Sequence, residues 1–392
     1  MDETAREAAL REVYLDNAAT TYPKPEAVYA ALERFAREVG GNPGRGGHAR
    51  SLEAGREVLR ARDAVARLLR VGDPSRVIFT KNATEALNVA IQGVMRGGGH
   101  AVITSLEHNS VWRPLEAMAR SGAITYSIVE CGKDGALEPS AVRAAITPET
   151  RLIACVHASN VTGGLLPVED IAEIADERRI AFLLDAAQTA GRKELHPEAM
   201  GVHYLAFSGH KELFGPQGTG VLYIASGWEV EPLSYGGTGS LSESSSQPEF
   251  LPDRYESGTL NAFGLAGLRA GVEFVLEAGV ENIRGHEEEL TLRMLEGLDR
   301  MKGITVYGPR DWERRVGIVS FNLAGLTSSE VASRLDDAYG IRVRSGLHCS
   351  PLAHRTIGTL ESGVVRAGLS YLNTAEDVDL LLEALGAMLS SV

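Results

Sequence analysis

The feature that most constrains the fold is an alternation of short apolar runs with helical patterns through the first 225 residues. Each run has the length of a buried strand, and amphipathic stretches such as Thr84–Val94 and Val168–Arg178 separate several of them. The runs are Val77–Thr80, Ala101–Thr104, Ile124–Val129, Leu152–Val156, Ile180–Leu184, Tyr204–Phe207 and Gly220–Ile224. Repetition of strand, helix and strand predicts an α/β chain with a mostly parallel sheet.

The later part of the chain changes in character. Gly220–Ile224 follows Tyr204–Phe207 too closely for a helical crossover, so we expect one antiparallel pair there. Residues 234–257 are rich in Gly, Ser and Pro and form either a flexible linker or an ordered loop over a site. Beyond them we expect helices at Phe263–Glu277, Glu281–Met301, Ser329–Tyr339 and Ala375–Leu389, and strands at Ile318–Leu323 and Val364–Tyr371. A chain of 392 residues is therefore expected to add a second, α+β domain.

Charge and composition exclude several classes of function. The formal net charge is −13 and no basic run occurs, which argues against binding to nucleic acid or to an anionic membrane surface. Met1–Glu12 lacks the apolar stretch of a signal peptide, and no apolar run approaches the roughly 20 residues that span a bilayer. The three cysteines show neither a disulfide framework nor metal-ligand spacing. We therefore expect a cytoplasmic protein without a metal site.

Lys211 is the first candidate for chemistry. The chain has six lysines, and the other five lie among turn or charge signals typical of a solvated surface. Lys211 instead follows a predicted buried strand, beside His210 and before the turn at 215–218. An amine at the carboxyl end of an α/β sheet can bond covalently to a carbonyl cofactor. On this segment alone, a surface lysine in a loop remains the alternative.

Asp185 and Thr84 also lie at predicted strand ends. Asp185 ends an apolar strand, and a buried carboxylate needs a partner because burial of an unpaired charge is costly. That partner is either a protonated pyridine nitrogen or, alternatively, a helix terminus or an arginine. The N–H groups at 83–85 and the hydroxyl of Thr84 begin a helix and suit a phosphate, although Thr84 also fits an ordinary helix start.

Three further residues lie in unusual settings. Cys349 stands on a loop beside His348 and near Arg344, where a thiolate is stabilised, unless it is an incidental loop thiol. Arg366 lies inside an apolar strand, which favours a grip on a substrate carboxylate or a structural ion pair. His108 follows a strand and either stacks on a flat ring or is structural. Cys131 and Cys155 lie in or beside predicted strands and are interpreted as packing residues, so they are left out of the site.

Together these residues provide a lysine that can bond to an aldehyde, a carboxylate that can pair with a pyridinium nitrogen, and a helix start that can bind a phosphate. They also provide a histidine that can stack on a ring and an arginine that can bind a substrate carboxylate. Those are the parts of a pyridoxal-phosphate site. The motifs, from the segment at 14–21 to the segment at 366–370, stand in the order typical of one family. The chain resembles the class V aminotransferase-like enzymes and, within them, the cysteine desulfurases. Residues 344–349 resemble the short catalytic loop shared with selenocysteine lyases, except that Leu347 stands where that group has a second histidine.

The resemblance implies a role for each matching residue. It implies that Lys211 carries the cofactor, Cys349 accepts sulfur as the nucleophile, and His108 stacks on the ring. The implied cofactor contacts are Ala83, Thr84, His108, Asn160, Asp185, Gln188, Ser208, His210, Lys211 and, reaching the neighbouring subunit, Gly258 and Thr259. The implied substrate contacts are Asn160, Arg344 and Arg366.

The resemblance also implies the wider organisation. The expected fold is fold type I of the pyridoxal-phosphate enzymes, with a mixed, mostly parallel seven-stranded sheet in a large domain at 22–257. Residues 1–21 and 258–392 are expected to form the small domain that carries Cys349. The expected activity converts cysteine to alanine with a persulfide on Cys349, in a homodimer with shared active sites that passes sulfur to an acceptor protein. The alternatives are a selenocysteine, cystine or cysteine-sulfinate lyase, an aminotransferase, or, more remotely, a non-catalytic sulfur-relay or iron–sulfur scaffold protein.

Overall fold

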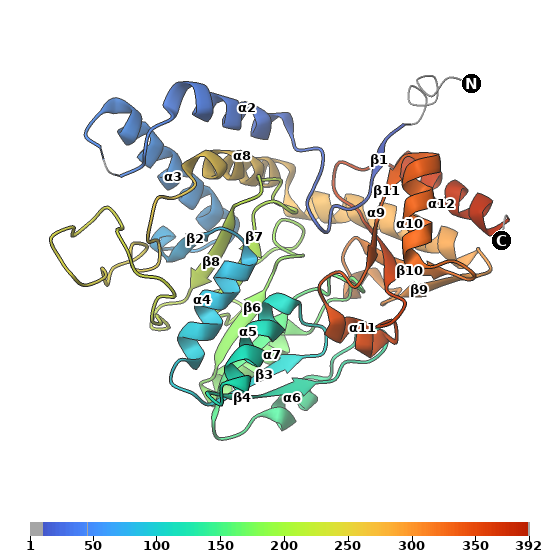
Figure 1. The fold of residues 1–392 in the computed structure, drawn as a ribbon, viewed down its shortest axis with the longest axis horizontal. Coiled ribbons are helices and arrows are strands. Elements are labelled where there is room, and N and C mark those ends of the chain that lie inside the picture. The colour runs from blue at the N-terminus through green and yellow to red at the C-terminus, as the bar shows by residue number, and fades with distance from the viewer. Residues whose placement is uncertain (1–10, 45, 391–392) are drawn as a thin grey trace.

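The computed structural model describes residues 11–44 and 46–390. The expectation for Met1–Glu12 therefore lies almost wholly outside the described residues. Two sheets dominate the fold, a larger one within residues 77–224 and a smaller one within residues 304–368 (Figure 1). Among the described residues, no helix is long and apolar enough to cross a membrane.

The larger sheet has seven strands in the order β2-β8-β7-β6-β5-β3-β4. Its strands are β2 (Val77–Thr80), β3 (His100–Thr104), β4 (Thr125–Val129), β5 (Thr150–Val156), β6 (Ala181–Asp185), β7 (Tyr204–Ser208) and β8 (Gly220–Ile224). Strands β3 to β7 run parallel to one another, whereas β8 is antiparallel to both β7 and β2. The mixed, mostly parallel seven-stranded sheet and its antiparallel pair are therefore confirmed.

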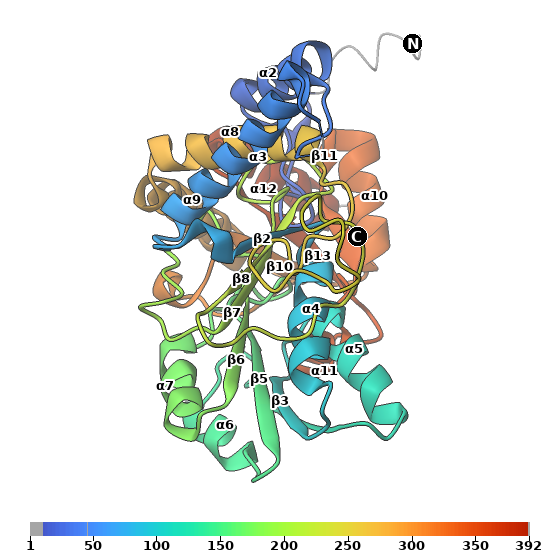
Figure 2. The same ribbon diagram turned by 90° about the vertical axis from the view of Figure 1, so that its left-hand side faces the viewer.

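Helices cover both faces of this sheet (Figure 2). They are α3 (Ala49–Leu68), α4 (Ala83–Met95), α5 (Asn109–Arg120), α6 (Pro139–Ala145), α7 (Val168–Arg178) and α8 (Ala262–Ala278). Helix α2 (Glu26–Arg34) packs against α8. Alternate strand residues pack to opposite sides, so Ile103 meets the cluster containing α4 and α5, whereas Val102 meets the cluster of α3, α7 and α8. A parallel sheet buried on both faces explains why its strands are almost wholly apolar.

The C-terminal part builds the smaller sheet, in the order β12-β13-β10-β9. Its elements are α9 (Val280–Asp299), β9 (Ile304–Tyr307), β10 (Ile318–Leu323), α10 (Ser328–Tyr339), β11 (Ile341–Arg342), β12 (Arg344–Gly346), α11 (Pro351–Ile357), β13 (Val364–Gly368) and α12 (Ala375–Leu389). Near the other end of the chain, β1 (Val13–Tyr14) pairs with β11. The expected strand at 364–371 ends three residues early, because Asn373 turns the chain by accepting a hydrogen bond from the Ser370 N–H.

Two features bear on the expected domain division. Helix α8 shares a buried cluster with α3 and with strands of the larger sheet, although it follows residue 257 in the chain. The Gly- and Ser-rich stretch at 234–257 contains neither a helix nor a strand, and runs beside α3 and β2 (Figure 1). The domain boundaries stay a prediction.

Candidate active site

One cavity gathers the candidate residues at the carboxyl ends of the central strands. Its volume is about 270 Å³. Parallel strands end at a common edge of the sheet, so residues that follow β3, β5, β6 and β7 meet there. Nine residues expected to bind the cofactor line this cavity, namely Ala83, Thr84, His108, Asn160, Asp185, Gln188, Ser208, His210 and Lys211.

Lys211 and Asp185 form the charged centre of the cavity. Asp185 is the last residue of β6 and is 3% exposed, and its Oδ1 accepts a hydrogen bond from the Ala187 N–H at 2.9 Å. Burial raises the pKa of Asp185, and the Ala187 amide and the nearby Lys211 oppose that shift. Burial lowers the pKa of Lys211 to about 8, although Asp185 favours its charged form. A sizeable fraction of the Lys211 amine is thus neutral and nucleophilic near neutral pH.

The first turn of α4 gathers hydrogen-bonding groups at another side of the cavity. The Ala83 N–H donates to Ser208 Oγ at 3.0 Å, and a 2.7 Å hydrogen bond joins the hydroxyls of Thr84 and Ser110. Asn82 caps the helix by accepting from the Glu85 N–H. A cluster of hydroxyl groups at a helix N-terminus favours an anion such as a phosphate group. Ser110 was missed from the sequence because it is an inconspicuous residue two positions after His108.

His108 is held by the start of α5. Its Nδ1 accepts from the Ser110 N–H at 3.1 Å, so the side chain caps the helix. Burial, with help from Lys211 and Arg344, lowers the pKa of His108 to about 4. The imidazole is therefore neutral near pH 7 and is bound at one ring nitrogen.

Arg366 lies next to the cavity and already has partners. Its Nη2 donates to Asp16 Oδ1 at 2.9 Å and its Nη1 to the Asn160 carbonyl at 3.1 Å. Among the described residues its Nε has no hydrogen-bond partner. Asp16 belongs to the quoted motif at 14–21, but no role was predicted for it. The structure thus contains the structural ion pair that was the alternative for Arg366, while Arg344 on the neighbouring β12 is more exposed.

Cys349 is an exposed free thiol on a loop that is tied to the cavity wall. Asn160 Nδ2 donates to the His348 carbonyl at 2.7 Å, and Asn160 Oδ1 accepts from Ser350 Oγ at 2.6 Å. The Asn109 N–H donates to the Cys349 carbonyl at 2.9 Å. The resemblance implied that Asn160 contacts the cofactor and the substrate, but not that its side chain anchors the Cys349 loop. The other two cysteines, Cys131 and Cys155, are buried.

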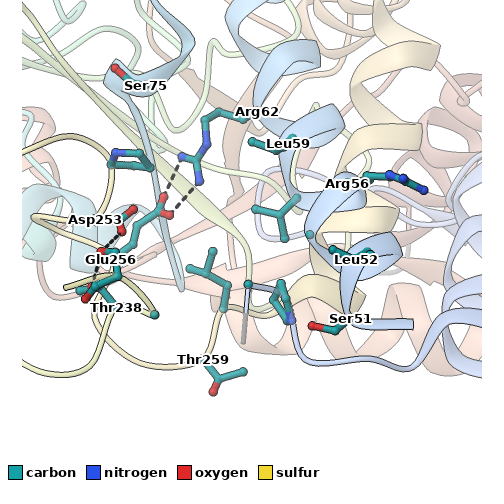
Figure 3. Close-up of a pocket in the computed structure, with 18 of the residues that line it drawn as sticks. Ser51, Leu52, Arg56, Leu59, Arg62, Ser75, Thr238, Asp253, Glu256 and Thr259 are labelled. Carbon is teal, nitrogen blue, oxygen red and sulfur yellow. Dashed lines mark hydrogen bonds and ion pairs between the residues drawn. The ribbon is translucent and has the colours of Figure 1, made fainter. Parts of the chain in front are cut away.

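Gly258 and Thr259 line a different cavity, of about 670 Å³, between α3 and the segment at 238–260 (Figure 3). Two parallel hydrogen bonds join the buried Arg62 to Glu256, at 2.8 and 2.7 Å, and Glu256 Oε1 also accepts from the Phe79 N–H at 2.6 Å. Of the described residues expected to bind the cofactor, Gly258 and Thr259 are the two that the structure separates from Lys211.

Comparisons with known proteins agree with this geometry. The family model of the class-V aminotransferases matches residues 13–381. A probable cysteine desulfurase from Methanothermobacter thermautotrophicus is 36% identical, covering 95% of this chain and 94% of its own. A cysteine desulfurase from Yersinia pestis is 34% identical, covering 95% of this chain and 92% of its own.

Solved structures show the same similarity. The apo structure of a cysteine desulfurase from Thermococcus onnurineus has a TM-score of 0.92 at 33% identity, over 97% of this chain and 95% of that one. A cysteine desulfurase from Escherichia coli, described as an S-sulfonic acid, has a TM-score of 0.88 at 27% identity, over 100% of this chain and 99% of that one. The chain therefore belongs to the class-V aminotransferase family, in which it is similar to proteins named cysteine desulfurases.

Proposed function

We propose that the protein is a pyridoxal-phosphate-dependent cysteine desulfurase, which converts cysteine to alanine and holds the sulfur on Cys349. The observation that carries the proposal is the presence of Lys211 and Asp185 in one cavity whose wall residue, Asn160, anchors the loop of an exposed cysteine. Its relatives named cysteine desulfurases, at 34% and 36% identity, support the same reaction.

The residues of the cavity fit pyridoxal phosphate. Among the described residues, Gln188 Oε1 and His210 Nδ1 are buried polar atoms without a hydrogen-bond partner, as expected for groups that meet a polar ligand. Lys211 would bond to the aldehyde, Asp185 would hold the ring nitrogen, and Thr84 with the Ala83 amide would hold the phosphate. When bound, the cofactor supplies a ring that withdraws electrons from the amino acid.

The side chains of the protein perform the proton transfer and orient the substrate. The Lys211 amine, once free and neutral, removes the proton from the substrate α-carbon and later returns a proton. The neutral His108 would stack on the cofactor ring without adding positive charge beside it. Arg344 and Arg366 orient the substrate carboxylate. Because Arg366 is already bound to Asp16, the carboxylate must take its free Nε or displace Asp16.

Sulfur transfer takes place at Cys349. Its thiolate attacks the sulfur of the substrate, a new S–S bond forms, and the carbon–sulfur bond of the substrate breaks. The electron pair of the broken bond stays with the carbon skeleton, which leaves as alanine after protonation. The exposed position of Cys349 suits later delivery of sulfur to an acceptor protein.

The proposal includes a homodimer with shared active sites. Gly258 and Thr259 lie away from the Lys211 cavity of their own chain, which fits a role at the phosphate of a second copy. The larger cavity beside them carries exposed apolar side chains, including Leu52 and Leu59 of α3. Sedimentation at micromolar concentration is expected to give twice the mass of the 41.9 kDa chain.

The test is to incubate the pyridoxal-phosphate-loaded protein with cysteine and to measure alanine, together with the mass of the Cys349 peptide. We expect alanine without an added keto acid, and a persulfide on Cys349. The Cys349→Ser variant should keep the visible absorbance of the cofactor but release no sulfide. A keto-acid requirement would indicate an aminotransferase, and alanine only from selenocysteine, cystine or cysteine sulfinate would indicate one of the alternative lyases.

A further inference from the structure

A buried group of charged side chains lies next to Lys211 but does not line its cavity. It consists of Arg192, Glu212 and Glu287, whose side chains are each 1% exposed. Glu212 directly follows Lys211 in the chain. Charged residues are almost never buried this completely unless they are paired. The proposed reaction uses none of the three, so their burial needs another reason.

Arg192 connects segments that are distant in the sequence. Its Nη2 contacts Glu212 Oε1, lies 3.3 Å from Glu287 Oε1 and donates to the Leu369 carbonyl at 3.0 Å. Arg192 follows β6, which ends at Asp185, and Leu369 follows β13, which contains Arg366. One guanidinium therefore joins the segments that carry Asp185, Lys211 and Arg366 to helix α9.

Taken by themselves, these three residues are neutral as a group only when one of the two carboxyl groups is protonated. Two ionised carboxylates and one guanidinium would leave a net charge of −1 in a buried site, which is costly. The Oε1 atoms of Glu212 and Glu287 both contact Arg192 Nη2, which brings the two carboxyl groups close together. Burial raises the pKa of Glu212, and raises that of Glu287 to about 8. Two carboxyl groups in contact share one proton, because both cannot be ionised at low cost.

The surrounding charges come from several elements. Lys211 and Lys24 face Glu212, and Arg284 of α9 faces Glu287. Burial lowers the pKa of Lys24 to about 8. Glu212 favours the charged form of Lys211, whereas Arg192 disfavours it. The protonation of the buried group is thus coupled to that of the amine that performs the proposed chemistry.

We propose that Arg192, Glu212 and Glu287 are positioning residues, which hold Lys211 at a fixed place relative to Arg366. One proton shared between the two carboxyl groups keeps this buried arrangement neutral. The inference rests on the proposed role of Lys211. It adds that the placement and ionisation of Lys211 depend on α9, a helix outside the larger sheet.

The first test measures the ionisation of Lys211 in the full-length chain freed of cofactor. A pulse of acetic anhydride at a series of pH values, followed by peptide mass spectrometry, gives the midpoint at which the Lys211 amine becomes reactive. We expect Glu212→Gln to lower this midpoint, because the negative charge that the two carboxyl groups share is then confined to Glu287, away from Lys211. We expect Arg192→Met to raise the midpoint, because it removes a positive charge that acts on Lys211. The exposed Glu289→Gln, on the same helix as Glu287, is the matched control and should leave the midpoint unchanged.

Unchanged midpoints in folded Glu212→Gln and Arg192→Met protein would overturn the inference, because a purely structural cluster would not affect the ionisation of Lys211. If Arg192→Met does not fold, Glu212→Gln decides the matter. In the cofactor-loaded protein, Arg192→Lys should lower kcat/KM for cysteine by roughly 10- to 100-fold, because small displacements of reacting groups have effects of this size. A wild-type kcat/KM in this variant would also contradict the positioning role.

The second test addresses the shared proton. A carboxyl group whose pKa is raised to about 8 destabilises the fold progressively as the pH rises from its ordinary pKa toward 8, because over that range the folded state keeps a proton that the unfolded state has lost. The melting temperature of the wild-type holoprotein should therefore fall relative to that of Glu287→Gln between pH 5 and pH 8. Parallel curves would refute proton sharing. Failure of the proposed function would instead appear as wild-type protein that forms no persulfide on Cys349, whatever these variants do.

Discussion

The anchoring of the Cys349 loop by Asn160 gives a sharp prediction. His348 and Cys349 both have a left-handed backbone, with φ of 48° and 58°, although neither is glycine. Such a conformation costs roughly 1–2 kcal/mol for each residue. The two side-chain hydrogen bonds of Asn160 to this loop, at 2.7 and 2.6 Å, contribute about 1 kcal/mol each and offset part of that strain.

Asn160→Ala should therefore destabilise the loop by about 2 kcal/mol, which is roughly a 30-fold shift toward open conformations. Hydrogen–deuterium exchange of the peptide covering residues 346–352 measures that shift, because the Ser350 N–H is protected by the Leu347 carbonyl. We expect this amide to exchange up to about 30-fold faster. Sulfide release from cysteine should fall as well, because Cys349 is held at the cavity for less of the time.

The matched control is Asn109→Ala. The Asn109 N–H bonds to the Cys349 carbonyl, and that backbone contact survives the substitution, while its side-chain Oδ1 has no hydrogen-bond partner in the described part of the chain. This variant should exchange as the wild type does. Exchange in Asn160→Ala within about twofold of the wild-type rate would refute the argument, because the two hydrogen bonds would then contribute almost nothing.

Two further predictions concern the charged groups. The Lys211 amine should become reactive with a midpoint near pH 8. Asp185→Asn should lower that midpoint, because it removes a neighbouring negative charge. A midpoint near 10.4, the pKa of a free lysine, would contradict the described burial of Lys211. Arg62→Met leaves the buried Glu256 without its ion-pair partner. We therefore expect the free energy of unfolding to fall by about 3–5 kcal/mol and the thermal unfolding transition to move to a lower temperature. An unchanged transition would show that Glu256 finds another partner.

The sequence was most informative where local pattern decides structure. Strands such as β2 and β8 are found at the predicted residues, because their apolar runs are bounded by turn residues on both sides. The expected strand at 364–371 was too long, because its apolar pattern continues past the turn that follows Gly368. Helices α2 and α3 were not predicted. Exposed apolar residues such as Tyr29 and Leu59 lie outside their buried faces and interrupt the amphipathic pattern.

The cavity was predictable because parallel strands bring their carboxyl ends to one edge, so a polar residue after each strand is a candidate. Contacts between distant segments were not predictable in the same way. Asp16 is 350 positions from Arg366, and no local pattern pairs them. The group at Arg192 was missed for a related reason: its partner Glu287 lies on a helix whose polar residues resemble those of a solvated face.

The most direct test of the account is covalent attachment of the cofactor at position 211. The protein is loaded with pyridoxal phosphate, reduced with borohydride, digested and analysed by mass spectrometry. We predict a pyridoxyl phosphate adduct on the peptide that contains Lys211, with the exposed Lys81 unmodified. A protein that binds no pyridoxal phosphate, or an adduct on another lysine with Lys211 unmodified, would contradict the account.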